Sequence, residues 1–392
     1  MMTKTILLVD DDSLVLELYR KKLVAGGYEV HTATDGLAAI KLLGEMVPDF
    51  IVLDLMMPRL SGADVMKFIR SKPSLARVPV AVWTNAFMSE QARQVNALGI
   101  SRAIVKGDYT PAKLLELANE MTSDKPDSAP TADAQSPDAA LPAPRSPEVE
   151  AFRVGFLKKV AAEYETLRTL TEEFGRDSAL ASRTGSLSDL GQRVHRLSGS
   201  AGLAGLPYLA RLSNALEALL VELTDKPQLI NASTTRTVTN AVTLLGDLIQ
   251  RAPTERYSDP KLGTVLTVDD DPTSNEVVLS ALRRVGITAE AVTHPNAALH
   301  LATQEQFDLA LLDVELPQLN GFELTRKLRE LPGHANLPVV YITSYVDFEH
   351  RAKAAGTTDG DWIIKPILPI ELAMKALSHL IRARFASPAA NP

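Results

Sequence analysis

Three acidic residues near the start of the chain could cooperate in phosphoryl chemistry. Asp10 and Asp11 follow the apolar run 6–9, and Asp54 follows the apolar run 50–53. Carboxylates gathered in one cleft repel one another unless a cation joins them, and a hard divalent ion such as Mg²⁺ prefers such oxygen ligands. With that charge screened, one carboxylate can attack a phosphoryl group in line. The pattern therefore predicts an Mg²⁺ site with Asp54 as the nucleophile.

A lysine and a hydroxyl group are needed to hold the remaining oxygens of a transferred phosphoryl group. Lys106 and Thr84 each close a further apolar run. The carboxyl ends of the strands of a parallel sheet lie at one edge, where such folds bind their ligands. We therefore expect Asp10, Asp54, Thr84 and Lys106 to converge on one cleft.

A histidine, His195, lies in a helical pattern that is rich in glycine. Apolar residues recur at helical spacing through residues 187–204. Gly191, Gly199 and Gly202 fall on the helix face that carries His195. Each interior glycine costs roughly 0.5–1 kcal/mol relative to alanine, so the bare strip calls for a reason. We interpret it as room for another surface to approach the imidazole closely.

The acidic pattern occurs twice. Asp269 lies 259 positions after Asp10, and Asp270 lies 259 positions after Asp11. The same offset links Asp54, Thr84 and Lys106 to Asp313, Thr343 and Lys365. A run of matched residues at one offset indicates a duplicated domain.

Each copy alternates short apolar runs with helical patterns, which predicts a doubly wound, flavodoxin-like α/β fold with a five-stranded parallel sheet. Between the copies the chain lacks strand-like runs and predicts an all-α antiparallel bundle, with helices at 149–174, 187–204, 207–223 and 228–249. The predicted domains are 1–121, 148–252 and 261–386. A Pro, Ala and Ser-rich tether at 122–147 and a short linker at 253–260 join them.

Composition excludes several classes of function. The net charge of −7 with no long basic run disfavours nucleic-acid binding. The chain has no cysteine, which removes disulfides and thiolate chemistry. No apolar run is long enough to span a membrane, and acidic residues within the first dozen positions make a poor secretory signal. We therefore expect a cytoplasmic protein that binds neither a membrane nor nucleic acid.

Both α/β copies resemble the receiver domains of response regulators, on the motifs ILLVDDD and VLTVDDD and on the residues at the constant offset. The resemblance implies that Asp54 and Asp313 are phosphoacceptors and that each receiver binds one Mg²⁺. It implies Asp10 with Asp11, and Asp269 with Asp270, as metal-binding acid pairs. It further implies Lys106 and Lys365 as phosphoryl contacts, Thr84 and Thr343 as switch hydroxyls, and the backbone carbonyls of Met56 and Glu315 as metal ligands.

The two copies differ beside the lysine. The second has Lys365-Pro366 and Trp362, where the family usually has an aromatic switch residue. The first has Lys106-Gly107 and Ala103 in those places. The resemblance therefore implies phosphoryl and metal binding in both copies, and an aromatic rotamer change in the second.

The segment HRLSGSAGLAGLPYLARLSNALE resembles a histidine-containing phosphotransfer domain, whose surface histidine exchanges a phosphoryl group with receiver aspartates. By that resemblance His195 is the phosphoacceptor of the bundle. The family often has a lysine three residues after the histidine, and Ser198 stands there in this chain. Arg193 and Arg196 are nearby cations, but neither lies on the face of His195.

The resemblance implies a phosphorelay protein that passes a phosphoryl group between Asp54 or Asp313 and His195. Its implied partners are a sensor histidine kinase and a downstream response regulator or output protein. The receivers would catalyse only their own phosphorylation and dephosphorylation, since the chain lacks the glycine-rich ATP-binding segment of a kinase. As an alternative, one receiver could serve as a docking surface, constitutive or controlled by phosphorylation.

An aspartyl-phosphate phosphatase of the haloacid dehalogenase type needs a second Asp two residues after the nucleophile as general acid. Met56 and Glu315 occupy that place, so this reading fits poorly.

Overall fold

A computed structural model gives the structure of the protein and describes residues 3–57, 59–84, 98–106, 109–123, 147–176, 180–253, 262–344 and 361–386. The chain divides into two compact units. Unit 1 comprises residues 1–167, 189–217 and 248–259, and unit 2 comprises residues 168–188, 218–247 and 260–392. Apart from their outermost residues, the predicted linkers 122–147 and 253–260 lie outside the described residues, and the domain boundaries stay predictions.

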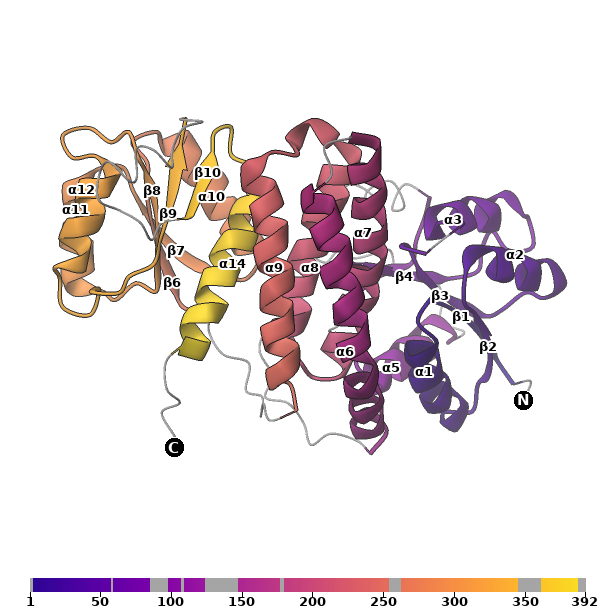
Figure 1. The fold of residues 1–392 in the computed structure, drawn as a ribbon. Helices are drawn as coiled ribbons and strands as arrows, with labels where there is room; N and C mark the ends of the chain where they lie inside the picture. The colour runs from indigo at the N-terminus through magenta and orange to yellow at the C-terminus, as the bar shows by residue number, and fades with distance from the viewer. Residues whose placement is uncertain are drawn as a thin grey trace. The chain divides into compact units, whose positions relative to one another are not determined.

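Unit 1 contains a sheet of five parallel strands in the order β2-β1-β3-β4-β5 (Figure 1). The strands are β1 (Thr5–Val9), β2 (Glu29–Ala33), β3 (Phe50–Asp54), β4 (Val80–Thr84) and β5 (Arg102–Val105). All five residues of β3 are buried, as expected for a central strand covered on both faces. The register sets Val9 beside Leu53 and Asp54 beside Trp83, so these strands end at one edge of the sheet.

Four described helices cover this sheet: α1 (Ser13–Ala25), α2 (Gly36–Glu45), α3 (Gly62–Ser71) and α5 (Pro111–Met121). Helix α1 packs against α5 on one face of the sheet, and α2 packs against α3 on the other (Figure 1). Asp12 caps α1, because its side chain accepts a hydrogen bond from the Leu14 backbone amide. A Cβ at Gly62 would overlap the backbone carbonyl oxygen of Asp54, so glycine lets α3 begin directly beside the end of β3.

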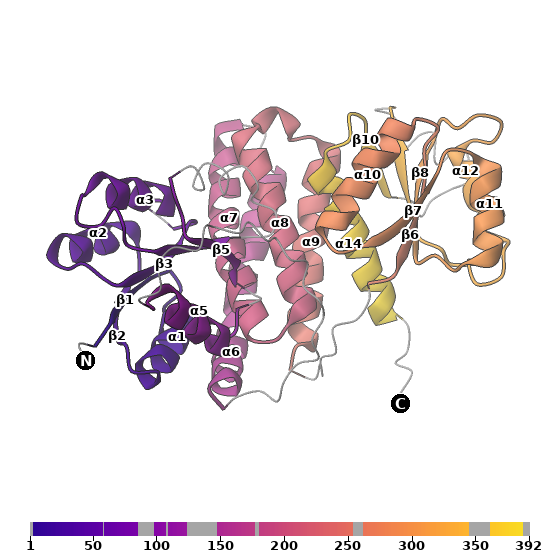
Figure 2. The ribbon, with the colours of Figure 1, turned by 180° about the vertical axis from the view of Figure 1, so that it is seen from behind.

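Unit 2 contains a second sheet with the same strand order, β10-β9-β8-β6-β7. Its strands are β6 (Thr264–Val268), β7 (Thr288–Val292), β8 (Leu309–Asp313), β9 (Val339–Thr343) and β10 (Asp361–Ile364). The described helices of this domain are α10 (Pro272–Arg284), α11 (Pro295–Gln304), α12 (Gly321–Arg329) and α14 (Pro369–Ala386). Helices α10 and α14 lie side by side, and so do α11 and α12 (Figure 2).

The segment between the two sheets is helical, as predicted. It consists of α6 (Pro147–Arg176), α7 (Leu180–Leu203), α8 (Pro207–Asp225) and α9 (Ala232–Arg251), with a short 3₁₀ turn, η2 (Pro227–Leu229), before α9. Two helix starts differ from the prediction by four residues or more. Helix α7 begins seven residues before the predicted start and runs through Gly185. Helix α9 begins after Asn231, whose side chain accepts a hydrogen bond from the Thr234 amide, so the cap sets the start.

None of the described helices has the length and apolar character needed to cross a membrane.

Candidate functional site

The ends of β1 and β3 and the residue after β5 bring a lysine between two carboxylates in unit 1. Lys106 Nζ lies 2.6 Å from Asp10 Oδ2 and 2.9 Å from Asp54 Oδ2. All three side chains are buried. The structure thus brings Asp10, Asp54 and Lys106 together, as the sequence predicts. Thr84 ends β4, but its side chain lies outside what the structure describes.

The buried charges of this cluster shift one another's titration. Burial raises the pKa of Asp10 to about 7, with a further rise from the Asp54 carboxylate, against the opposing charge of Lys106. Burial also opposes ionisation of Asp54, but Lys106 and His195 outweigh it and hold the pKa of Asp54 well below its usual range. The carboxylate best placed to stay anionic is therefore Asp54.

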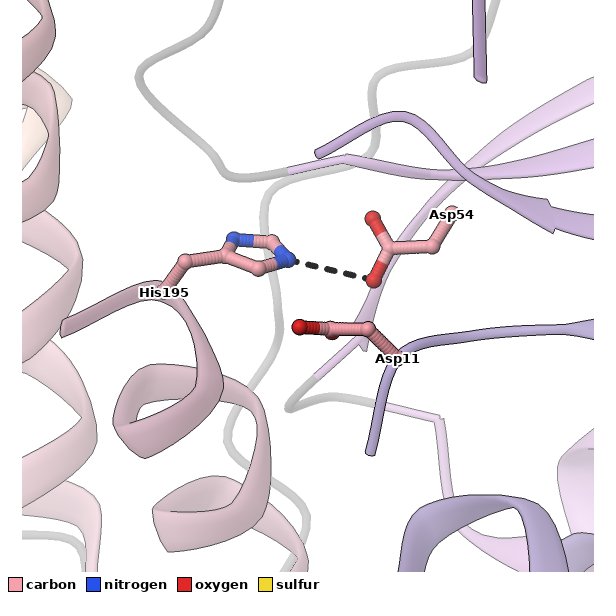
Figure 3. Close-up of side chains that lie close together, drawn as sticks. All are labelled: Asp11, Asp54 and His195. Carbon is pink, nitrogen blue, oxygen red and sulfur yellow. Dashed lines mark hydrogen bonds and ion pairs between the residues drawn. The ribbon is translucent and has the colours of Figure 1, made fainter. Parts of the chain in front are cut away.

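His195 on α7 faces this cluster within unit 1. Its Nε2 lies 3.1 Å from Asp54 Oδ2, and its Nδ1 lies 2.8 Å from Glu217 Oε1 on α8. Figure 3 shows the imidazole directed at the Asp54 carboxylate, with Asp11 beside it. The histidine side chain is 9% exposed, because the first α/β domain covers the helix face that carries it. Burial lowers the pKa of His195, but Asp54 and Glu217 outweigh it and raise the pKa well above its usual value.

Glu217, which orients the histidine, was not predicted from the sequence. Its side chain is fully buried, and its second oxygen lies 3.1 Å from the hydroxyl of Ser198. Ser198 therefore contacts Glu217, the residue that binds His195. Ser198 stands at the position where a phosphotransfer domain often has lysine. The available signal was a carboxylate inside the apolar run of α8, flanked by Leu216 and Leu219, because such a charge needs a buried partner.

The glycine strip has a physical reason at one position. A Cβ on Gly199 would lie 2.8 Å from Cδ of Lys106, so glycine is what admits the lysine of the receiver. A Cβ on Gly191 would meet nothing within 4 Å, so the prediction of close approach does not hold there.

Two further polar contacts join the first receiver to α7. The hydroxyl of Ser200 donates a hydrogen bond to the carboxylate of Asp12. Arg196 Nε lies 3.9 Å from Asp11 Oδ2, whereas Arg193 Nη1 pairs with Glu163 Oε1 at 2.9 Å. Of the two arginines weighed from the sequence, Arg196 is the one that reaches an acid of the receiver.

The cluster offers oxygen ligands suited to a hard cation. Ligand atoms of Asp11, Asp54 and His195 lie within 4.8 Å of one another. Asp11 Oδ1 is buried and has no hydrogen-bond partner in the part of the chain that the structure describes. A buried carboxylate oxygen of this kind is costly unless a cation or another donor reaches it. The carboxylates of Asp11 and Asp54 therefore fit an Mg²⁺ ion. The Asp10 carboxylate instead contacts Lys106.

Met56 and Glu315, two positions after Asp54 and Asp313, contribute through their backbone. The amide of Met56 donates a hydrogen bond of 3.0 Å to Asp54 Oδ1, and the amide of Glu315 does the same to Asp313 Oδ1. These bonds fix the rotamer of each aspartate. The predicted role of the two carbonyl oxygens as metal ligands stays a prediction.

Unit 2 repeats the acidic cluster in a more open form. Ligand atoms of Asp269, Asp270 and Asp313 lie within 4.8 Å of one another. Lys365 Nζ lies 3.1 Å from Asp269 Oδ2 and 2.6 Å from Asp313 Oδ2. Thr343 is buried at the end of β9. The Lys365 side chain is 27% exposed, against 6% for Lys106, so solvent reaches this second site.

Comparison with known proteins agrees with this organisation. The response regulator receiver domain family matches residues 6–119 and 265–377, and the Hpt domain family matches residues 154–252. The polar-differentiation response regulator DivK of Brucella ovis is 32% identical over 110 residues, which cover 28% of this chain and 89% of DivK.

Two further proteins are similar to one receiver of the chain. An uncharacterized 14.6 kDa protein of Leptolyngbya boryana is 34% identical over 108 residues, which cover 28% of this chain and 82% of that protein. The receiver domain of sensor histidine kinase PA1611 from Pseudomonas aeruginosa PAO1 was solved with a magnesium ion coordinated in its active site cleft. It is 25% identical, and the match covers 30% of this chain and 97% of that one, with a TM-score of 0.28.

Fold and matched families together define a two-component signal transduction protein. The chain belongs to the response regulator family, and its receiver–Hpt–receiver architecture is that of a phosphorelay protein.

Proposed function

We propose that this protein passes a phosphoryl group reversibly between Asp54 and His195. The observation that carries the proposal is the hydrogen-bond contact of 3.1 Å between His195 Nε2 and Asp54 Oδ2, a distance that must lengthen to admit the phosphorus atom between them. Lys106 lies on the same carboxylate oxygen and can neutralise an equatorial oxygen of the transferred group. Tethering of the two domains in one chain raises the local concentration of each acceptor for the other.

The proposed transfer exchanges one bond to phosphorus for another. The bond from phosphorus to Asp54 Oδ2 breaks and leaves its electron pair on the carboxylate, while the lone pair of His195 Nε2 forms the new bond. Asp54 and Glu217 favour a ring that is protonated on both nitrogens in the unphosphorylated protein, so Nε2 must first lose its proton for this step. Glu217 holds the remaining ring proton on Nδ1. The Glu217 carboxylate balances the positive charge that the phosphorylated ring acquires.

We propose that each receiver holds one Mg²⁺, at Asp10, Asp11 and Asp54 with the Met56 carbonyl in the first, and at Asp269, Asp270 and Asp313 with the Glu315 carbonyl in the second. The acidic clusters and the buried oxygen of Asp11 support this. The chemistry that Mg²⁺ supplies at such a site is neutralisation of the phosphoryl oxygens. Thr84 and Thr343 are the proposed switch hydroxyls of the two receivers. Lys365 is the proposed phosphoryl contact of the second receiver.

We further propose that Asp313 is a second phosphoacceptor. A sensor histidine kinase supplies the phosphoryl group, and a downstream response regulator or output protein accepts it. The matched receiver and Hpt families support this, because their aspartates and histidines exchange phosphoryl groups with such proteins.

The test uses the full chain carrying Asp313→Ala, so that Asp54 is the remaining receiver acceptor. The protein is incubated with acetyl phosphate and Mg²⁺, and intact mass is recorded before and after alkali, which hydrolyses aspartyl phosphate and spares phosphohistidine. We expect an alkali-stable phosphoryl group that is lost on adding His195→Gln or Asp54→Ala, and no loading in EDTA. Two outcomes would contradict the transfer. One is an alkali-stable phosphoryl group that remains in Asp54→Ala, and the other is a protein that is phosphorylated on Asp54 but gains no alkali-stable phosphoryl group.

Glu217→Gln is expected to slow transfer while leaving Asp54 loading unchanged. The amide keeps the size of the side chain but removes the charge that holds the Nδ1 proton of His195. A charged hydrogen bond is worth about 1.5–3 kcal/mol, or roughly a 10- to 100-fold loss in rate. Glu222→Gln on the same helix, whose carboxylate pairs with Lys226, is the matched control and should transfer at the original rate. Equal rates in the two variants would remove Glu217 from the mechanism.

A further inference from the structure

One face of α9 carries an arginine that contacts the second receiver domain within unit 2. Arg236 Nη2 lies 3.2 Å from Asp361 Oδ1, and its guanidinium carbon lies 3.2 Å from the centroid of the Trp362 ring. Asp361 and Trp362 are the first two residues of β10. A planar guanidinium can pair with a carboxylate and stack on an indole at the same time, which lysine does not match.

Hydroxyl groups of α9 extend this contact along the helix. Ser233 Oγ lies 2.5 Å from Glu371 Oε1 and 3.1 Å from the Trp362 carbonyl oxygen, and Thr237 Oγ1 lies 3.1 Å from the same Glu371 oxygen. Ser233, Thr237 and Glu371 are all buried. Ser233, Arg236 and Thr237 recur on α9 at the three-and-four spacing of one helical face. The contact is therefore a row of polar side chains along one face of α9. The single hydroxyl proton of Ser233 can be donated either to Glu371 or to the Trp362 carbonyl oxygen, but not to both at once.

A third contact lies one turn further along. Arg382 Nη2 on α14 donates a hydrogen bond of 3.1 Å to the backbone carbonyl of Asn240. From the receiver side, the contacts come from β10 and α14, which defines the docking face as Asp361, Trp362, Glu371 and Arg382. None of these residues belongs to the Asp269, Asp270 and Asp313 cluster, so docking leaves that cluster free to react.

Asp361 is the electrostatic centre of the docking face. Besides Arg236, it pairs with Lys375 Nζ at 2.7 Å and lies 3.6 Å from His379 Nε2. Burial raises the pKa of Asp361, but the His379 hydrogen bond and the charges of Lys375 and Arg236 outweigh it and hold this pKa below its usual range. Asp361 is thus an anion when it meets the arginine of α9.

The first receiver carries different chemistry at the same strand positions. Arg102 pairs with Ala81 in the first sheet as Asp361 pairs with Val340 in the second, so Arg102 and Ala103 are the equivalents of Asp361 and Trp362. Arg102 Nη2 instead pairs with Glu120 Oε1 at 2.9 Å. On α9 the first receiver would set an arginine against Arg236 and would offer no ring for stacking. Two guanidinium groups in direct contact repel each other, so this site on α9 favours the second receiver over the first.

We infer that the second receiver domain docks on α9 through the face formed by Asp361, Trp362, Glu371 and Arg382, and that Arg236 makes this site selective for the second receiver over the first. The inference goes beyond phosphoryl transfer and does not depend on it. The second receiver is held to the Hpt helices by a face that differs from its phosphoacceptor site.

The absence of cysteine makes the full chain convenient for the test. Spin labels on Thr243→Cys in α9 and Val277→Cys in α10, both exposed, report the distance between the helix and the receiver by double electron–electron resonance without phosphodonor. We expect one narrow distance distribution, which broadens in Arg236→Glu and Arg236→Ala. Thr239→Glu lowers the charge of α9 by one unit, as Arg236→Ala does, but at an exposed position, and it should leave the distribution unchanged.

A second readout separates undocking from misfolding. In a Trp83→Phe background Trp362 is the remaining tryptophan, and its emission should shift to the red when Arg236→Ala removes the stacked guanidinium, while the circular dichroism spectrum stays the same. A broad distance distribution in the chain with native Arg236 would overturn the inference. So would a narrow distribution that persists in both Arg236 variants. Because no phosphodonor is present, failure of the proposed transfer leaves these outcomes unaffected.

Discussion

Gly199→Leu is expected to reduce the rate of transfer between Asp54 and His195 by roughly 100-fold or more. A Cβ at this position already lies 2.8 Å from Lys106 Cδ, and Lys106 cannot swing away because Asp10 and Asp54 hold its ammonium. A leucine must therefore push α7 away from the receiver, and a displacement of about 1 Å at a reacting centre can cost on the order of 100-fold. The measurement is the rate at which alkali-stable phosphoryl groups appear in the full chain carrying Asp313→Ala.

The chain offers a matched control on the same helix. Gly191→Leu makes the same substitution where a Cβ meets nothing within 4 Å, and it should transfer at the original rate. Loading of Asp54 should be equal in both variants, since neither residue belongs to the receiver. Equal slowing in the two variants would place the effect in the helix rather than in the approach of the receiver.

Asp361→Asn is expected to lower the free energy of unfolding of the second receiver by about 3–5 kcal/mol, because it removes the carboxylate charge that the buried Lys375 ammonium contacts at 2.7 Å. Urea denaturation followed by Trp362 fluorescence in the Trp83→Phe background measures the change. Asp64→Asn removes an exposed partner of Lys67 and should cost less than about 1 kcal/mol, detected by the circular dichroism of the same samples. A loss below about 1 kcal/mol for Asp361→Asn would show that the ion cluster contributes little.

Much of the fold follows from local patterns. Short apolar runs that end in Asp, Thr or Lys mark strands β1, β3, β4 and β5, and α1 spans residues 13–25 because Asp12 caps it and Gly26 and Gly27 follow its end. The helices between the sheets were harder to delimit. Gly185 reads as a break yet lies inside α7, and the cap that begins α9 depends on a side-chain geometry that periodicity does not reveal.

The site was predictable to the extent that it lies at strand ends. Asp10, Asp54 and Lys106 converge because the parallel register brings those ends to one edge of the sheet. Glu217 and Arg236 were not predicted, since each acts by contacting a residue far away in the chain. Periodicity assigns such residues to a helix face but cannot say which residue of another helix or domain meets them.

The covered position of His195 sets a condition on any outside partner. With its ring against Asp54 and its side chain 9% exposed, the histidine is already occupied by the first receiver. A competitor tethered in the same chain acts at an effective concentration on the order of millimolar. An external response regulator must therefore bind the Hpt surface well enough to outcompete that neighbour, or wait for it to dissociate. Under the proposed function, access to His195 is therefore set by competition between the first receiver and the external protein.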